Sequence, residues 1–224
     1  MNEQAILQNP VKSAGNIVKV SAMRGGVKRA LDVVISCILL VAFLPVLFII
    51  STAVSIDGGP VLYGHRRVGR NGIDFLCLKF RTMVIDGDEV LASHFERNPA
   101  AREEWLASRK LRDDPRVTFI GNLLRRTSLD ELPQLLNVLR GDMSLVGPRP
   151  IVHDEIVYYR DSYSYYTSLR PGLTGAWQTS GRSDTSYDER VAFDVDYAKN
   201  QSLSRDLHIL LRTIPAVLMT RGSF

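Results

Sequence analysis

VVISCILLVAFLPVLFIISTAVSI, residues 33–56, contains no charged side chain and is bounded by Asp32 and Asp57. The stretch is longer than the roughly 20 apolar residues that a helix needs to cross a bilayer. A fully buried helix of a soluble protein is the alternative, but such helices are seldom this long without a polar face. The stretch therefore predicts a segment inserted into a membrane.

Pro45 lies near the middle of this apolar stretch. It has no N–H to donate to the carbonyl of Val41 and biases Leu44 away from helical geometry, so we expect a sharp break there. Basic residues flank the stretch on both sides: Lys12, Lys19, Arg24, Lys28 and Arg29 before it, and Arg66, Arg67 and Arg70 after it. Because basic flanks favour the cytoplasm, the pattern favours a re-entrant helix–break–helix over the alternative, a kinked span.

A secretory signal peptide also combines basic residues, an apolar region and small residues. The apolar region here exceeds the roughly 7–15 residues that such a signal uses, and the basic leader is long as well. Both lengths argue against a signal peptide and against the periplasmic hydrolase that one would imply.

The remaining sequence predicts an α+β fold that is mainly helical and membrane-associated (monotopic), with interfacial amphipathic helices. We expect a mobile leader over residues 1–26, a re-entrant membrane helix over 27–57 and a cytoplasmic catalytic domain over 58–224. Alternating apolar residues around RNG (70–72) predict a short β-hairpin. Glycines in residues 168–184 predict a functional loop rather than a regular element.

Two apolar patterns leave alternatives open. Tyr159, Tyr163 and Tyr166 have helical spacing, which fits either a packing face or an aromatic belt at the membrane surface. The tail at residues 204–224 has apolar residues on one side, which fits either an interfacial helix or core packing.

Charge is clustered although the net charge is only +4. Basic residues gather in two groups: Arg66, Arg67, Arg70, Lys79 and Arg81, and then Arg125, Arg126, Arg140 and Arg149. Such clusters favour an anionic partner such as a phosphate, a lipid headgroup or nucleic acid. Cys37 and Cys77 form neither a metal motif nor a disulfide framework, which fits a reducing compartment.

Two adjacent carboxylates lie in TSLDELPQL, residues 127–135. One explanation is helix capping, in which Asp130 is the N-cap and Pro133 lies in the first turn, where N–H groups have no intrahelical partner. The other is catalysis by Asp130 and Glu131, and the two roles are not exclusive. Local sequence favours capping because caps are common, so the surrounding residues must decide.

The chemistry around this motif suits phosphate. Four histidines follow no metal or nucleophile pattern: His65, His94, His153 and His208. Arginine forks match phosphate oxygens, and an acidic residue can hold Mg²⁺ together with substrate phosphates. An aspartate can also accept a phosphoryl group covalently.

Three motifs resemble the bacterial sugar transferase family of monotopic phosphoglycosyl transferases: KFRTM (79–83), RRTSLDELPQLLNVLRGDMSLVGPRP (125–150) and RPGLTGAWQTSGR (170–182). The likeness runs from Lys28 to the end of the chain and includes the membrane segment, which in this family is a re-entrant helix broken at proline. Many relatives have Ser-Pro at the break, whereas this chain has Leu44–Pro45.

The resemblance implies that Asp130 is the nucleophile and that Glu131 binds magnesium. Further positions match residues near the substrate phosphates: Lys79, Arg81, Arg125, Arg149, Arg182 and the acidic Asp194. The insertion EEWLASRKLRDDP (103–115) resembles members that transfer galactose or glucose phosphate.

The implied enzyme moves hexose-1-phosphate from a UDP-hexose to undecaprenyl phosphate, releases UMP and forms a covalent aspartyl intermediate, with Mg²⁺ as cofactor. This would be the first membrane step of exopolysaccharide synthesis. We expect a monotopic protein on the cytoplasmic face of the bacterial inner membrane, in contact with lipid and without a nucleic-acid partner, and a homodimer is left open. The rival is a membrane-anchored module that binds anionic lipid or nucleic acid, but it does not explain why acidic and basic residues converge on rigid turns.

Overall fold

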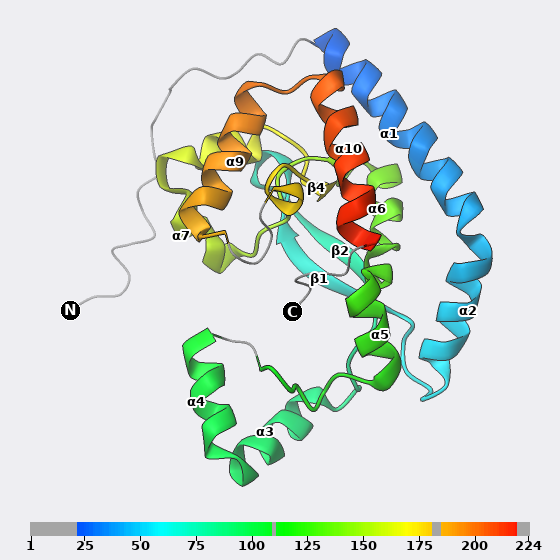
Figure 1. Ribbon diagram of the computed structural model, residues 1–224, viewed down its shortest axis with the longest axis vertical. Coiled ribbons are helices and arrows are strands. Elements are labelled where there is room, and N and C mark those ends of the chain that lie inside the picture. The colour runs from blue at the N-terminus through cyan, green and yellow to red at the C-terminus, as the bar shows by residue number, and fades with distance from the viewer. Residues whose placement is uncertain (1–21, 109–110, 181–184, 219–224) are drawn as a thin grey trace.

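A computed structural model describes residues 22–108, 111–180 and 185–218. The fold is α+β and mostly helical, as predicted, with two small two-stranded sheets (Figure 1). Its strands are β1 (Leu62–Val68), β2 (Asp74–Phe80), β3 (Ser144–Val146) and β4 (Gly172–Thr174). Its helices are α1 (Ala22–Ala42), α2 (Leu44–Ser55), α3 (Gly87–Arg97), α4 (Pro99–Ser108), α5 (Phe119–Thr127), α6 (Gln134–Arg140), α7 (Ile156–Tyr159), α8 (Tyr163–Thr167), α9 (Tyr187–Lys199) and α10 (Leu203–Leu218).

Helices α1 and α2 are bent by 64° relative to each other, which confirms the predicted break. The break falls at Phe43, and Pro45 lies in the first turn of α2, where its missing N–H leaves no helical bond unmade. Helix α1 begins at Ala22, inside the predicted leader, and residues 1–21 lie outside the described residues. Within the described ranges no single helix is long and apolar enough to cross a membrane, whereas the bent pair together has the length and composition to do so.

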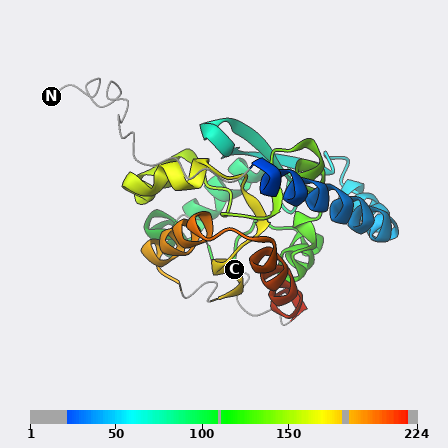
Figure 2. The same cartoon turned by 90° about the horizontal axis from the view of Figure 1, so that it is seen from above.

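The bent pair curves along one edge of the molecule (Figures 1 and 2). Several apolar side chains of this region are exposed. Val41 is 73% exposed, Phe48 72% and Ile56 79%. The inner face of α2 is different, because Ile50 and Val54 pack against Phe80 and Leu124. One side of the pair thus belongs to the core, and the other is an apolar surface of the kind that marks an interaction site.

Charged residues near the start of the bent pair bind the following domain. Lys28 Nζ lies 2.7 Å from Asp206 Oδ2 on α10, and Arg29 donates to the carbonyls of Val138 and Leu139 at the end of α6. Asp32, which bounds the apolar stretch, is buried and accepts hydrogen bonds from the Ser144 hydroxyl at 2.8 Å and the Leu145 N–H at 3.1 Å. The polar side of α1 therefore faces protein.

Arg81 binds the other end of the pair to the same domain. Its guanidinium contacts both carboxylate oxygens of Asp57, donates to Val54 O at 2.8 Å and, through Nε, to Pro60 O at 2.7 Å. Because the last carbonyls of a helix have no intrahelical donor, Arg81 caps the C-terminal end of α2. Both ends of the apolar pair are therefore fixed to one body.

Strands β1 and β2 form the predicted antiparallel hairpin, with Leu62 opposite Phe80 and Val68 opposite Asp74. Its turn is at Arg70–Gly72, where Asn71 adopts a left-handed φ of 59°. The buried side chain of Asn137 on α6 mimics a strand partner for β2. Its Oδ1 accepts from Leu78 N at 2.9 Å and its Nδ2 donates to Leu76 O at 2.8 Å, so this one side chain holds β2 against α6.

The prediction of a loop over residues 168–184 was partly wrong, because β4 lies within it and pairs in parallel with β3. A Cβ on Gly172 would lie 2.1 Å from Gly147 N, so only glycine permits these two backbones to approach so closely. Three-residue strands carry too little alternation to be recognised in sequence.

The structure bears on the two apolar patterns that sequence left open, the tyrosines and the C-terminal tail. Tyr159 and Tyr166 are buried in a cluster with Val68, Ile151 and Val191, so the tyrosines form a packing face rather than an exposed aromatic belt. Helix α10 buries Ile209, while Leu207, Leu211 and Ile214 are more than half exposed.

Helices α3 and α4 form a helical hairpin at one end of the molecule (Figure 1).

Replacing Asn137 with alanine should destabilise the fold by about 2–4 kcal/mol, because it removes a fully buried side chain and leaves the Leu76 carbonyl and the Leu78 N–H without their partner. Chemical unfolding of the purified protein measures this. Asn122→Ala is the matched control, since Asn122 is exposed on α5, and it should change stability by less than about 0.5 kcal/mol. Equal effects of the two substitutions would contradict the role of Asn137.

Candidate functional site

Asp130 and Glu131 lie in a single 3₁₀ turn, Leu129–Glu131, between α5 and α6. Ser128 precedes the turn with a left-handed φ of 57° and ends α5. The predicted capping role of Asp130 was wrong, because α6 begins only at Gln134, and no side chain caps it. The sequence pattern was misleading because proline is tolerated both in the first turn of a helix and at the position just before the helix, where Pro133 lies.

Lys79 on β2 binds both carboxylates. Its Nζ lies 2.6 Å from Glu131 Oε1 and 3.4 Å from Asp130 Oδ2. Asp130 is only 7% exposed, whereas the Glu131 side chain is 37% exposed. The structure therefore brings together three predicted site residues, and the hairpin supplies the cation that holds the two acids in place.

Opposing effects set the charge of the Asp130 carboxyl. Burial raises the pKa of Asp130, the nearby charge of Lys79 lowers it, and that of Glu131 raises it again, with a net increase. Burial lowers the pKa of Lys79, but attraction to Glu131 and Asp130 outweighs it, so that pKa is raised. Asp130 is thus a more basic carboxylate than an exposed aspartate, next to a firmly charged ammonium group.

Arg125 approaches the same acids from α5. Its Nε donates to Thr82 Oγ1 at 2.9 Å, and the charge of Asp130 acts on its pKa, which burial lowers. Helix α5 reaches this position because Gly121 packs on the backbone of Thr82, where a Cβ would lie 2.0 Å from the carbonyl oxygen. Lys79, Arg125, Asp130 and Glu131 therefore form one cluster, which we call the acidic-pair cluster.

The predicted phosphate-binding residues do not all join the acidic-pair cluster. Arg81 is 9% exposed, and its guanidinium N–H groups bind Asp57, Val54, Pro60 and Met83. A phosphate would have to displace one of these partners, so its phosphate role stays a prediction. Arg182 lies outside the described residues.

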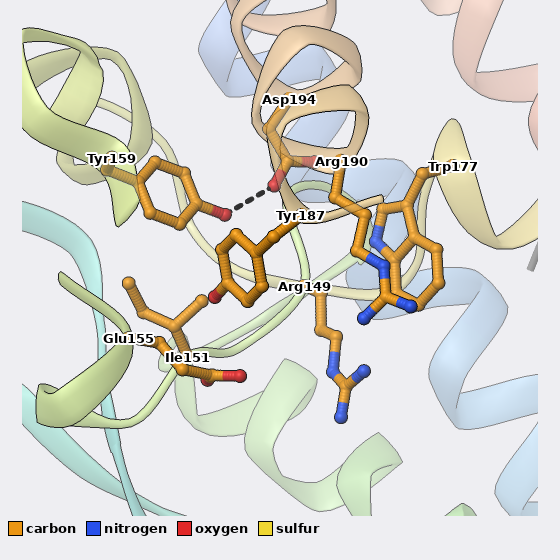
Figure 3. Close-up of a pocket in the computed structure, with 8 residues that line it drawn as sticks. All are labelled: Arg149, Ile151, Glu155, Tyr159, Trp177, Tyr187, Arg190 and Asp194. Carbon is orange, nitrogen blue, oxygen red and sulfur yellow. Dashed lines mark hydrogen bonds between the residues drawn. The ribbon is translucent and has the colours of Figure 1, made fainter. Parts of the chain in front are cut away.

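Arg149 and Asp194 belong to a second group, which lines a pocket between α7, α9 and the loop after β4 (Figure 3). Arg149 is exposed on the loop after β3, whereas Asp194 is 3% exposed and accepts a hydrogen bond of 2.7 Å from the Tyr159 hydroxyl. Burial raises the pKa of Asp194 to about 7. The Tyr159 hydroxyl therefore satisfies the buried carboxylate of Asp194 within the fold. The role of Asp194 toward substrate stays a prediction.

The sequence prediction missed two residues of this pocket, Trp177 and Arg190. The only signals in sequence were their residue types, since an indole can stack with a guanidinium group and an arginine can bind phosphate with two N–H groups. What sequence could not supply is that α9 brings Arg190 over the ring of Trp177.

Among the described residues no three or more His, Cys, Asp or Glu side chains gather into a metal site. The adjacent carboxylates of Asp130 and Glu131 still fit Mg²⁺, which is commonly bound by one or two carboxylates, substrate phosphates and water. Glu131 is the more exposed of the two, although the ammonium group of Lys79 now contacts one of its oxygens.

Comparison with known proteins identifies the family. The model of the bacterial sugar transferase family matches residues 23–220. The exopolysaccharide production protein ExoY of Sinorhizobium fredii is 55% identical over 202 residues, which cover 89% of each chain. The undecaprenyl-phosphate galactose phosphotransferase of Salmonella typhimurium is 51% identical over 197 residues, 88% of this chain and 41% of that protein.

A more distant relative, the UDP-glucose:undecaprenyl-phosphate glucose-1-phosphate transferase of Caulobacter vibrioides, is 42% identical over 208 residues, 88% of this chain and 72% of that protein. The family match at residues 23–220 includes the bent helix pair, the acidic-pair cluster and the pocket, and together with these relatives it confirms the resemblance seen in the motifs. The chain therefore belongs to the bacterial sugar transferase family and is a transferase enzyme.

Proposed function

We propose that this enzyme transfers hexose-1-phosphate from a UDP-hexose to undecaprenyl phosphate, with release of UMP. The observation that carries the proposal is the buried carboxylate of Asp130, held beside Glu131 by Lys79 in a chain of this family. Relatives named for galactose and for glucose transfer support a hexose of one of these two kinds. Measuring UMP release from a panel of UDP-sugars, with undecaprenyl phosphate and Mg²⁺ present, tests the proposal and identifies the sugar.

In the proposed reaction an Asp130 carboxylate oxygen attacks the β-phosphorus of the UDP-hexose. A new oxygen–phosphorus bond forms, the bond from the β-phosphorus to the bridging oxygen breaks, and UMP leaves with that oxygen. An oxygen of undecaprenyl phosphate then attacks the same phosphorus, which frees the Asp130 carboxylate and gives an undecaprenyl diphosphate hexose. The raised pKa of Asp130 favours this role, because a more basic carboxylate is a better nucleophile once it is ionised.

Cations around Asp130 would stabilise the charge that develops during transfer. Lys79 and Arg125 both act on this carboxylate, and their fixed positions suit a phosphoryl group that gains negative charge on its oxygens. Glu131, with Asp130 beside it, would hold Mg²⁺, which would offset the charge of the diphosphate when bound.

We propose further that the bent helix pair enters one leaflet of the cytoplasmic membrane and returns, with the domain on the cytoplasmic face. Support comes from the anchoring of both ends. Lys28 and Asp32 bind α10 and β3, while Asp57 binds Arg81, so both ends of the pair contact one folded body. In a spanning helix these ends would lie on opposite sides of the bilayer. The outward apolar surface of the pair suits lipid.

Asp130→Asn should abolish UMP release, because the amide is isosteric but is no comparable nucleophile. We expect a loss of at least about 10³-fold in kcat, with a folded protein. Turnover and thermal unfolding are measured on the same preparation. Asp161→Asn is the control, since Asp161 is an exposed carboxylate far along the chain and should keep normal activity. A folded Asp130→Asn protein with full activity would refute the nucleophile.

Glu131→Gln should weaken the dependence of rate on Mg²⁺, since an amide oxygen is a poorer ligand for a hard cation than a carboxylate. Titrating Mg²⁺ against the rate should show a concentration for half-maximal activity raised by about tenfold or more. An unchanged titration curve would place the metal elsewhere.

Single cysteines near Lys12 and near Asn71, in a background without Cys37 and Cys77, should both be labelled from the cytoplasmic side only. Pro45→Leu should restore a continuous helix of about 36 Å, long enough to cross the roughly 30 Å hydrocarbon core and to move the leader to the periplasm. Pro99→Leu, outside the apolar pair, is the control and should change nothing. Periplasmic labelling of the leader in the unmodified protein would rule out the re-entrant arrangement.

A further inference from the structure

Two guanidinium groups lie over one indole ring in the pocket of Figure 3. The Arg190 guanidinium carbon lies 4.7 Å from the centroid of the Trp177 ring, and that of Arg149 lies 5.6 Å from it. Arg149 comes from the rigid loop after β3 and Arg190 from the first turn of α9. Two positive groups are thus held close to one aromatic ring by separate parts of the fold.

Neither arginine forms a salt bridge with an acidic side chain among the described residues, although the charge of Arg149 acts on the buried carboxyl of Asp194. The Nε of Arg190 is buried and makes no hydrogen bond. Both carboxylates of this pocket are occupied elsewhere, since Asp194 binds the Tyr159 hydroxyl and Glu155 accepts from Val152 N at 2.9 Å. Two like charges held close together are costly, and a buried donor without an acceptor adds to that cost, so the pair fits an anion that binds between them.

Charge links this pair to the acidic-pair cluster. Burial raises the pKa of Cys77 on β2 to about 11, and the charges of Lys79, Glu131 and Arg149 all act on the same thiol. Arg149 therefore lies within electrostatic range of the strand that carries Lys79. Because Arg149 is exposed, an anion bound to it can extend toward the acidic pair.

We propose that Arg149 and Arg190, supported by the ring of Trp177, bind a phosphate group of one of the enzyme's two phosphate-bearing substrates. The inference rests on the proposed function for the identity of those substrates, and it adds Arg190 and Trp177 as binding residues. An arginine pair can present several N–H donors to phosphate oxygens, and stacking on the indole restricts the guanidinium planes before the ligand arrives. The phosphate can come from the nucleotide or from the polyprenyl carrier.

The two tryptophans of the chain permit a site-specific test. Trp105→Phe leaves Trp177 as the sole tryptophan, and phenylalanine keeps an aromatic contact with Phe95 on the α3–α4 hairpin. Trp177 fluorescence is titrated in detergent with UMP, uridine, farnesyl phosphate and farnesol. A saturable change with UMP and none with uridine assigns the phosphate to the nucleotide. A saturable change with farnesyl phosphate and none with farnesol assigns it to the carrier.

Arg190→Gln in this background should weaken binding of the effective probe by at least tenfold, and Arg190→Lys should recover part of the loss because it keeps the charge but not the fork. Arg102→Gln is the matched control, since Arg102 is exposed on α4, and it should bind normally. Thermal unfolding establishes that each variant is folded. The inference is overturned if neither phosphate probe binds, if uridine binds as tightly as UMP, or if folded Arg190→Gln binds normally.

Measuring UMP release alongside binding distinguishes failure of the anion site from failure of the proposed reaction. Saturable, phosphate-dependent binding that depends on Arg190, in a protein that releases no UMP from any UDP-sugar, would support the anion site and refute the reaction. UMP release with no fluorescence response to either phosphate would support the reaction and overturn the site.

Discussion

Charged contacts at the two ends of the apolar stretch are the constraint on which the rest of the structure depends. Asp32 and Asp57 mark the limits of that stretch in sequence, and each binds the following domain, Asp32 through β3 and Asp57 through Arg81. Asp32 is buried at the first end, and at the second end the buried partner is Arg81, while Asp57 itself is exposed. A buried charged group without a partner would cost several kcal/mol, so these contacts fix where the helix pair can lie. The 64° bend then returns the chain to the same body.

Arg81 connects that constraint to the acidic-pair cluster. Lys79 lies on β2, and Arg81 is the first residue after that strand. One strand therefore positions both the residue that caps α2 and the residue that binds the two acids. Thr82, next in sequence, binds Arg125. Lys79, Arg81 and Thr82 follow closely on one another, so a single stretch of chain contacts the two acids, the end of α2 and Arg125.

The features of the fold and site that could be predicted from sequence are those set by residues close together in the chain. The hairpin, the break near Pro45 and the adjacency of Asp130 and Glu131 depend on neighbouring residues, and all were readable in sequence. The partner of Asp130 was not, because Lys79 is separated from it by 51 positions. Neither was the contact of β3 with β4, nor that of Asn137 with β2, since short strands and single amides give no periodic pattern. The capping interpretation failed for the same reason: the nearest explanation was local, and the real partner was distant.

Separate placement of the two basic groups suits a reaction that handles two phosphate-bearing molecules in turn. Lys79 and Arg125 act on Asp130, where the phosphoryl group would be attached, while Arg149 and Arg190 lie at Trp177 and leave that carboxylate alone. If all four cations surrounded the acidic pair, they would lower the pKa of Asp130 further and weaken it as a nucleophile. In the proposed reaction, separation of the two groups would let the enzyme hold anionic substrates while burial keeps the Asp130 carboxylate basic.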